Sequence, residues 1–456
     1  MNARCRAVLA LSLMVTLLVP TTGPAWAGGE RQPVTGSGGN AVVTWNVTAT
    51  SAAVACGLTP NGNPLAESRL YAMVHIAIHD ALNAIAPRFR SYTGQPAPTR
   101  DNRSASPEAA VAAAAFGVLG PALPCAAAQL QDAYDQALAA VPNGPAEAAG
   151  VRVGQAAAEA IQTDRSTDGS AELPLVVTDF PQGSQPGQYR FTPGQTFAFQ
   201  PLWGTVRPFA LSSAGQFTPS GPYAVTSPAY ARDLNEVKSL GGDDATGSRR
   251  TADQTEIALY WVNSSPLQWN SIARTVLAGH GKRMDMWDTA RMFGLLNMAM
   301  ADGYIASFYT KYLDPDTRLF WRPVTAIQEA DTDGNRATSA DPDWAPLRGT
   351  PPIPDYESAH AVEGGAGASV LTAFFGDRVR FSACSVSYPE SSNACAGTGS
   401  TAGVVRSFGS LSQAAAENAV SRIYVGFHFR KAAQDGNRHG DRIGNWAVCT
   451  VLTPVK

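Results

Sequence analysis

The stretch SRIYVGFHFR, residues 421–430, gathers a serine, two arginines and a histidine in a chain of 456 residues that is 16% charged and has six histidines in all. It continues an Ala- and Gln-rich stretch of a composition that favours helix. Gly426 is expected to end this helix and to turn the chain, which brings Arg422 and His428 to face the same point. Two interpretations are open: a helix end that faces water, or a site that holds an anion.

Two further segments of the C-terminal third carry groups that suit an oxyanion. Arg322, in FWRPVTAI, offers a planar fork of donors that stays charged when partly buried. In PDYESAHAVEGG, Ser358 is expected to be an N-cap, so that the backbone N–H groups of Ala359 and His360 point out of a helix start, where the dipole favours an anion. His360 would lie close enough to the anion to move a proton.

The order and spacing of these residues resemble the three-part signature of one superfamily. It joins the vanadium-dependent haloperoxidases with the type 2 phosphatidic acid phosphatases and the bacterial acid phosphatases. The matching elements are Trp321-Arg322-Pro323, Ser358-x-His360 and Ser421-Arg422-x5-His428, the third being the most specific. Stretches such as AVVTWNVTAT, AMVHIAIHDALNAI and GFHFRKAAQDG are similar to the bacterial haloperoxidase-like branch. The resemblance implies a mainly α fold, a helical bundle with an oxyanion site in its core and long irregular loops.

The resemblance also implies a role for each matching residue. His428 matches the histidine that ligates vanadium or attacks phosphorus, so it is the expected metal ligand, and His360 matches the acid–base histidine. The expected oxyanion-binding groups are Arg322, Arg422, the Ser358 hydroxyl, the Ala359 backbone and a lysine. The implied cofactor is vanadate, or phosphate if the protein is a phosphatase.

The sequence departs from the family pattern in two places. The family lysine would fall at Pro315, so the nearest upstream lysine, Lys311, is the expected substitute and Arg318 the alternative. Pro315 argues against a helix that continues from Lys311 to Arg322. The family's Pro-Ser-Gly-His is here Glu-Ser-Ala-His, which places the negative charge of Glu357 next to an anion site.

Three functions are open. A haloperoxidase would use bound vanadate to oxidise halide with hydrogen peroxide. A secreted acid phosphatase would form a phosphohistidine at His428 and hydrolyse a small phosphate ester. A non-catalytic oxyanion-binding protein would keep the site without turnover. More than 200 residues precede the signature, as in the haloperoxidase-like branch, and this favours the first function. The oligomeric state is not indicated.

Residues 1–27 have the pattern of a secretory signal peptide: a short basic start, an apolar run and an Ala-Trp-Ala cleavage site. The expected location is therefore extracellular or periplasmic. The apolar run is too short for a membrane span, and no membrane span is expected further along. No run of basic residues occurs and the net charge is −3, so nucleic acid is not an expected partner.

The remaining chain is expected to be helical in two regions. An N-terminal helical region, residues 28–240, includes 64–85, where apolar residues recur at helical spacing, and several Ala-rich segments. Residues 166–222 are rich in Pro and Gly, and form either a binding or covering segment or an ordered wrap around the helices. A C-terminal helical region, residues 241–456, carries the signature.

The cysteines are expected to form disulfides because the compartment is oxidising and no Cys-x-x-Cys pair exists. Cys384 with Cys395 is the preferred bridge, and Cys56 with Cys125 the second. Five cysteines follow the signal peptide, so one thiol, Cys449, is expected to stay free.

His75 and His79 form an i, i+4 pair, a spacing that can present a metal-binding face. The stretch is strongly apolar, however, and no third ligand is identifiable near them. Packing and capping roles are therefore favoured for these histidines and for Asp80.

Overall fold

The structure, a computed structural model, describes residues 40–59, 62–94, 102–262, 264–280, 284–386 and 404–455. Contacts within the chain separate residues 1–39 from a compact unit of residues 40–456, and only the second unit is described below. The expected signal peptide lies outside the described residues and stays a prediction.

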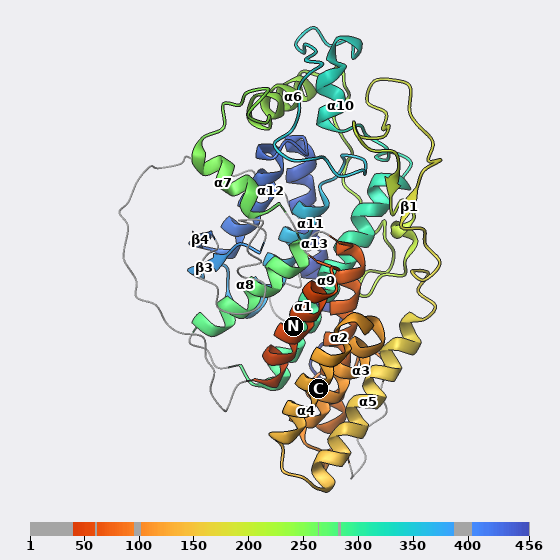
Figure 1. Ribbon diagram of the computed structural model, residues 1–456, viewed down its shortest axis with the longest axis vertical. Helices are drawn as coiled ribbons and strands as arrows, with labels where there is room; N and C mark the ends of the chain where they lie inside the picture. The colour runs from red at the N-terminus through yellow and green to blue at the C-terminus, as the bar shows by residue number, and fades with distance from the viewer. Residues whose placement is uncertain are drawn as a thin grey trace. The chain divides into compact units, whose positions relative to one another are not determined.

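Helices dominate the described residues, which confirms the mainly α class (Figure 1). They are α1 (Ala41–Ala55), α2 (Pro64–Ile85), α3 (Pro107–Ala122), α4 (Ala127–Ala139), α5 (Pro145–Arg165), α6 (Pro228–Leu240), α7 (Ala252–Tyr260), α8 (Ser265–Gly279), α9 (Met286–Tyr312), α10 (Pro323–Gln328), α11 (Ala359–Phe375), α12 (Leu411–Tyr424) and α13 (Arg430–Thr450). Two small antiparallel sheets accompany them, β1 (Val176–Val177) with β2 (Ala198–Phe199) and β3 (Phe381–Cys384) with β4 (Val405–Phe408).

Helix α2 shows how local chemistry sets the helix bounds. The Asn63 side chain accepts hydrogen bonds from the backbone N–H groups of Leu65 and Ala66, both at 3.2 Å, and Pro64 occupies the first position, where no N–H is needed. The helix ends at Ile85, so the helix expected over residues 64–85 is confirmed.

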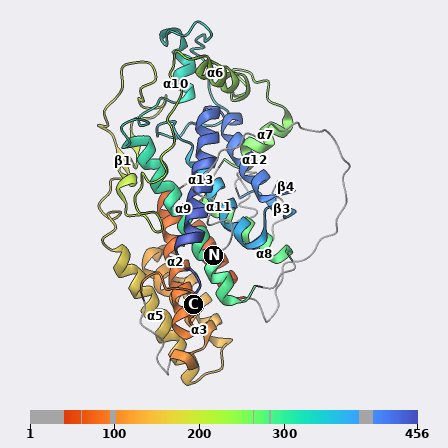
Figure 2. The same cartoon turned by 180° about the vertical axis from the view of Figure 1, so that it is seen from behind.

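Helix α9 lies at the centre of the bundle, in contact with α2, α11 and α13 (Figures 1 and 2). Most of its residues are buried, because helices surround it on several sides. The contact of α2 with α9 joins the two expected regions, residues 28–240 and 241–456, within one unit. Where one region ends and the other begins stays a prediction.

Helices α11 and α13 pack closely because glycine lines their contact. A Cβ atom at Gly440 of α13 would lie 1.9 Å from the backbone oxygen of Val362 on α11, so no larger residue fits. Nearer the start of α13, a Cβ atom at Gly436 would lie 2.6 Å from the backbone oxygen of Ser358, the N-cap of α11. Glycine therefore brings the start of α11, with Ser358, close to the first turns of α13, which His428 precedes.

The Pro/Gly-rich segment, residues 166–222, is an ordered wrap. On α9, the buried Asp302 carboxylate accepts three backbone hydrogen bonds from this segment, from Phe209, Ala210 and Leu211, at 2.6 to 2.8 Å. A buried carboxylate with several N–H donors is well satisfied, so these contacts hold the segment against the bundle.

The two histidines of α2 make separate packing contacts. His75 Nε2 lies 2.8 Å from Asn46 Nδ2 and its ring stacks on Phe293, while His79 donates from Nδ1 to Asp80 at 2.9 Å. In the described part of the chain, no group of three or more His, Cys, Asp or Glu side chains is arranged to hold a metal ion.

No single helix among the described residues is both long and apolar enough to cross a bilayer. Residues 107–122 and 124–139 meet the length and hydropathy criteria only as a pair, across a bend of 117°.

The disulfide between Cys56 and Cys125 is confirmed, with the two Cα atoms 5.6 Å apart. Cys395 lies outside the described residues, so its pairing with Cys384 stays a prediction. The prediction that Cys449 carries a free thiol is wrong, because Cys449 is disulfide-bonded.

Replacing both Cys56 and Cys125 by serine should lower the free energy of unfolding by about 4 kcal/mol. The bridge joins residues 69 apart, and in the chain-entropy model closing a loop of that length removes about that much free energy from the unfolded chain. Urea unfolding of the oxidised parent and the double variant measures the difference. Equal midpoints and slopes would contradict a stabilising role.

Candidate oxyanion site

The turn after α12 folds His428 back over Arg422. Gly426 has φ of +85°, and a Cβ atom there would lie 2.6 Å from the backbone oxygen of Gly241, so both conformation and space require glycine. The backbone N–H groups of Phe427 and His428 donate to the Arg422 carbonyl at 2.9 and 3.1 Å. The turn expected at Gly426 is confirmed.

Arg322 reaches His428 from the start of α10. It is the N-cap of that helix, with Pro323 at the first position. Its Nε donates to the Ile353 carbonyl at 2.6 Å, and its Nη1 donates to the Phe427 carbonyl and to His428 Nε2, both at 3.0 Å. Its Nη2 is buried and has no hydrogen-bond partner among the described residues.

Arg422 contributes a second buried guanidinium. Its Nη1 donates to the Trp261 carbonyl at 2.6 Å, and the guanidinium lies over the Phe427 ring at 5.1 Å from the centroid. Its Nη2 also lacks a partner among the described residues. A buried donor without a partner is costly, so the two arginines together present donors that a ligand would satisfy.

The structure places Lys311 in the same buried cluster and Arg318 at the surface. Helix α9 ends at Tyr312, and the chain loops back so that the Leu319 N–H donates to the Lys311 carbonyl at 2.7 Å. Lys311 Nζ donates to the carbonyls of Pro354 and Asp355 at 2.8 and 2.9 Å. A returning loop, not a continuous helix, therefore brings this lysine towards Arg322.

Ser358 stands at the start of α11, as expected, but its side chain does not cap the helix. Its hydroxyl is fully buried and has no partner among the described residues, and its N–H donates to the Ala432 carbonyl at 3.1 Å. The tie to α13 orients the residue, so the hydroxyl remains for a ligand. Ala359 is buried as the first residue of α11, and the partly exposed His360 follows it.

Asp355 is a site residue that the sequence pattern did not single out. His428 donates from Nδ1 to Asp355 Oδ1 at 2.9 Å, which leaves Nε2 as the nitrogen with a lone pair. Burial raises the pKa of Asp355 to about 7, opposed by Arg322 and Lys311. A carboxylate three residues before Ser358 was the available signal, but nothing local linked it to His428.

Glu357 is turned towards α13. His439 donates from Nδ1 to Glu357 Oε1 at 2.5 Å, and both side chains are buried. The negative charge expected next to the anion site therefore has a partner, one that the sequence pattern did not identify, since His439 lies 82 positions away.

The cluster is electrostatically suited to an anion. Burial, and then the nearby Arg322 and Lys311, hold the pKa of His428 well below its usual range, so the imidazole is neutral. Burial and Arg322 lower the pKa of Arg422 to about 9, and burial and Arg322 also hold the pKa of Lys311 well below its usual value. A bound anion would relieve this mutual repulsion. Two guanidinium nitrogens and a serine hydroxyl offer hydrogen-bond donors, and the neutral imidazole offers a lone pair at Nε2. Together they fit an oxyanion held at one histidine.

Comparisons with known proteins show what the chain as a whole is similar to. The family model for the VCPO second helical-bundle domain matches residues 291–456, which include every signature residue. A vanadium chloroperoxidase of Curvularia inaequalis is 25% identical over 474 positions, covering 81% of this chain and 75% of its own. The structure of a bacterial vanadium-dependent iodoperoxidase superposes with a TM-score of 0.73 at 25% identity, covering 91% of this chain and 98% of its own. Over most of its length, the chain is similar to vanadium haloperoxidases in sequence and fold.

A holo-type bacterial vanadium-dependent chloroperoxidase shares the fold at 17% identity, with a TM-score of 0.62 over 84% of this chain and 91% of its own. The vanadium haloperoxidase fold of this chain thus extends well beyond the second helical-bundle domain, into the N-terminal helices that pack on α9.

Two buried carboxyl groups, those of Glu67 and Glu363, lie near Tyr304, a tyrosine whose pKa Arg422 also influences. Glu67 on α2 accepts a hydrogen bond from Ser264 at 2.7 Å, and Glu363 on α11 has no partner for either oxygen among the described residues. Burial raises the pKa of Glu67 to about 8, and burial together with Glu67 raises that of Glu363 well above its usual value. Both acids are therefore largely protonated at neutral pH, which avoids burying two anions.

The contribution of Glu67 to stability should fall as pH rises from 4.5 to about 8, and Glu67→Gln should remove this contribution. In that interval the folded state keeps a proton on Glu67 that the unfolded chain releases, so unfolding is favoured by raising the pH. Each pKa unit corresponds to about 1.4 kcal/mol. Urea unfolding at pH 5, 6.5 and 8 should show Glu67→Gln gaining on the parent as pH rises.

The exposed Glu159 on α5 provides the control, because Glu159→Gln changes a charge that stays in solvent. Its stability relative to the parent should not follow pH in this way. A constant difference between Glu67→Gln and the parent at all three pH values would rule out the ionisation of Glu67 as the cause.

Proposed function

We propose that the chain is a vanadate-dependent haloperoxidase-like enzyme that oxidises halide with hydrogen peroxide. The observation that carries the proposal is the set of unpartnered donors on Arg322 and Arg422 beside the neutral imidazole of His428. Outside the site, the proposal is supported by the match to the VCPO second helical-bundle domain. It is also supported by the similarity to a vanadium chloroperoxidase and to a vanadium-dependent iodoperoxidase.

Each residue has a definite task in this proposal. His428 ligates vanadium through Nε2, because Asp355 holds the proton on Nδ1. The oxygens of the anion are bound by Arg322, Arg422, Lys311, the Ser358 hydroxyl and the Ala359 backbone N–H. When bound, vanadate supplies the Lewis-acid chemistry that activates hydrogen peroxide towards halide.

His360 is the proposed acid–base group. It follows directly after the residues that start α11, and it is near enough to His428 to contribute to that group's lowered pKa. Its partial exposure lets it exchange protons with solvent, whereas His428 is buried. Proton transfer at the imidazole of His360 would therefore accompany peroxide binding and halide oxidation.

The same donors would also hold phosphate, so a phosphatase acting through a phosphohistidine is the second candidate. The observation that favours it is the hydrogen bond from His428 to Asp355, since a carboxylate that orients a neutral imidazole also prepares it as a nucleophile. Hydrolysis of a generic phosphate ester by the purified protein would distinguish this candidate from the haloperoxidase.

We also propose that the protein is exported, to the extracellular space or the periplasm. The support is the signal-like pattern of residues 1–27 and the disulfide between Cys56 and Cys125, a bond that persists in oxidising compartments.

His428→Ala should abolish vanadate-dependent halide oxidation and any phosphatase activity together, since both need Nε2. His360→Ala should still bind vanadate but turn over about a hundredfold more slowly, the scale for losing a general acid–base group. Vanadate binding by equilibrium dialysis and bromide oxidation with peroxide distinguish the two variants. If the His428→Ala protein binds vanadate as tightly as the parent, His428 is not the vanadium ligand.

Lys311→Met should weaken vanadate binding by about 1 to 3 kcal/mol, the range for a hydrogen bond to a charged group, whereas Arg318→Ala should leave it unchanged. Lys311 is buried in the cluster and Arg318 is exposed, so Arg318 serves as the matched cationic control. Titration of the apo proteins with vanadate measures both. The opposite result, weaker binding for Arg318→Ala and unchanged binding for Lys311→Met, would assign the binding of the anion to Arg318 instead.

A further inference from the structure

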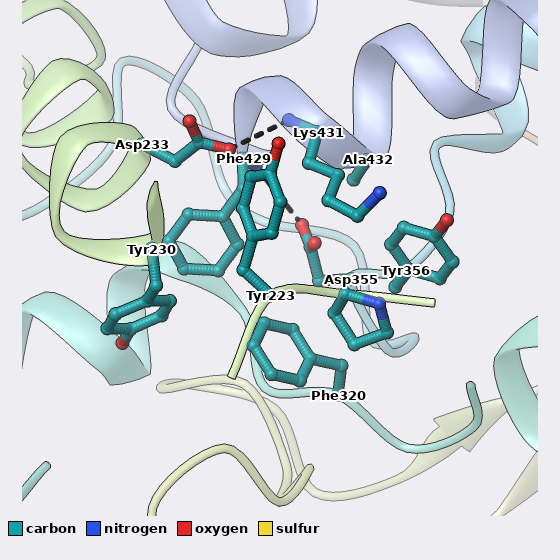
Figure 3. A pocket seen from close by; sticks show the side chains of 10 residues that line it. Tyr223, Tyr230, Asp233, Phe320, Asp355, Tyr356, Phe429, Lys431 and Ala432 are labelled. Atoms are coloured by element: carbon teal, nitrogen blue, oxygen red, sulfur yellow. Dashed lines mark hydrogen bonds between the residues drawn. The ribbon is translucent and has the colours of Figure 1, made fainter. Parts of the chain in front are cut away.

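Four consecutive residues before α11, from Asp355 to Ser358, each form a hydrogen bond to α13 or to the turn before it. The bonded pairs are Asp355 with His428, Tyr356 with Asp435, Glu357 with His439 and Ser358 with Ala432, at 2.9, 2.5, 2.5 and 3.1 Å. In Figure 3, Asp355 and Tyr356 lie beside Lys431 and Ala432 of the first turn of α13. The partners at positions 432, 435 and 439 are three and four residues apart, so they lie on one face of α13. This face supports the segment that carries Ser358.

The pair of Glu357 and His439 has no part in the chemistry described so far. Both side chains are buried, and His439 donates from Nδ1 to Glu357 Oε1. The other ring nitrogen of His439 and the other carboxyl oxygen of Glu357 have no partner among the described residues. Each side chain therefore depends on this one hydrogen bond. Without the donor, Glu357 would be a buried carboxylate with no partner, which is costly enough that the side chain would have to move.

A movement of Glu357 would reach Ser358, because the two residues are neighbours in the chain. The Ser358 backbone packs closely on α13: its N–H donates to Ala432, and a Cβ atom at Gly436 would lie 2.6 Å from its carbonyl oxygen. The Ser358 hydroxyl is fully buried and has no partner among the described residues. Its direction depends on the backbone that Glu357 begins, so a small shift there would turn the hydroxyl away from a bound anion.

Glu357 also lies near Lys311 of the oxyanion site. Burial and Arg322 lower the pKa of Lys311, and the carboxylates of Asp355 and Glu357 oppose this change. The pair could thus act on the anion through the charge of Lys311 or through the Ser358 hydroxyl. The structure favours the hydroxyl, because Glu357 directly precedes Ser358, whereas Lys311 Nζ donates to two backbone carbonyls instead.

We propose that His439 is a positioning residue of the oxyanion site. It holds the side chain of Glu357 in place, and Glu357 in turn keeps the Ser358 hydroxyl directed at the bound oxyanion. The proposal rests on the proposed function, because it assigns a support to the same site. It also explains how a carboxylate is accommodated one residue from an anion-binding hydroxyl, since a donor from α13 takes up its hydrogen bond.

The first test compares two replacements of His439. His439→Leu removes the donor and should weaken the binding of orthovanadate about tenfold, the scale of one hydrogen bond to an anion. In His439→Asn, the side-chain nitrogen is bonded to Cγ, as Nδ1 is in histidine, so a donor remains beside Glu357. This variant should bind within about threefold of the parent. Equilibrium dialysis of the vanadate-free proteins measures the affinities, and equally weak binding by both variants would overturn the role of the hydrogen bond.

The second test asks whether His439 acts through Ser358. In a protein that already carries Ser358→Ala, His439→Leu should cause no further loss of vanadate affinity, because the hydroxyl that it positions is gone. In the Lys311→Met protein, the same replacement should still cost about tenfold in affinity. Equal losses in the parent and in Ser358→Ala would overturn the proposal. A loss that disappears only in Lys311→Met would overturn it as well, in favour of a charge effect on the lysine.

A further variant guards against a folding defect in His439→Leu. Glu357→Leu with His439→Leu replaces both partners by apolar side chains, so no carboxylate is buried without a partner and the protein should fold. It should also bind vanadate about tenfold more weakly than the parent, and parent-like affinity would overturn the proposal. His280→Leu, at the C-terminal end of α8, is the matched histidine control and should keep the parent affinity.

Failure of this inference differs from failure of the proposed function. A parent that binds vanadate but oxidises no halide would overturn the proposed function, and the affinities of the His439 variants would still decide the inference. A parent that oxidises halide while His439→Leu keeps its affinity for vanadate would overturn the inference alone. A parent that binds no vanadate would overturn both.

Discussion

Burial of three cationic side chains around one histidine is the constraint on which the site depends. Lys311, Arg322 and Arg422 are all withdrawn from solvent, and burial lowers the pKa of each. The charge of Arg322 lowers the pKa values of Lys311 and Arg422 further. Backbone carbonyls of Pro354, Ile353, Trp261 and others take up some of their donors. Desolvated cations of this kind are stable only with such partners and become more stable when an anion arrives. The start of α10, the start of α11 and the turn between α12 and α13 all meet at this cluster.

Asp355 contacts both His428 and Lys311 of the oxyanion site. One oxygen fixes the tautomer of His428, and the other is buried without a partner among the described residues. Its backbone carbonyl also accepts a hydrogen bond from Lys311. A single carboxylate thus orients the histidine, helps to place the lysine and offers an acceptor beside the site. Asp355 therefore influences the geometry of the oxyanion site although it lies outside the three-part signature.

The rest of the bundle acts as a support for these contacts. Gly440 lets α13 approach α11 closely, and Asp302 ties the irregular segment to α9 through three backbone N–H groups. Just beyond this segment, Tyr223 lines a pocket together with Phe320 and Asp355 (Figure 3). The contacts at Asp302 support the ordered wrap, and a binding or covering role for the segment stays a prediction.

Much of the local structure could be predicted from the sequence by itself. The pattern of α2, its Asn63 cap, the end of α9 before Pro315 and the turn at Gly426 depend on residues within a few positions of one another. The order of the signature residues also indicated which side chains to examine. Contacts between distant residues could not be predicted in this way. The pairing of Asp355 with His428, that of Glu357 with His439, the return of the chain that buries Lys311 and the uncapped Ser358 hydroxyl were decided by tertiary structure. The physical reason is that helix propensity and capping act within one or two turns, whereas hydrogen bonds between buried side chains depend on how helices pack, which no local pattern specifies.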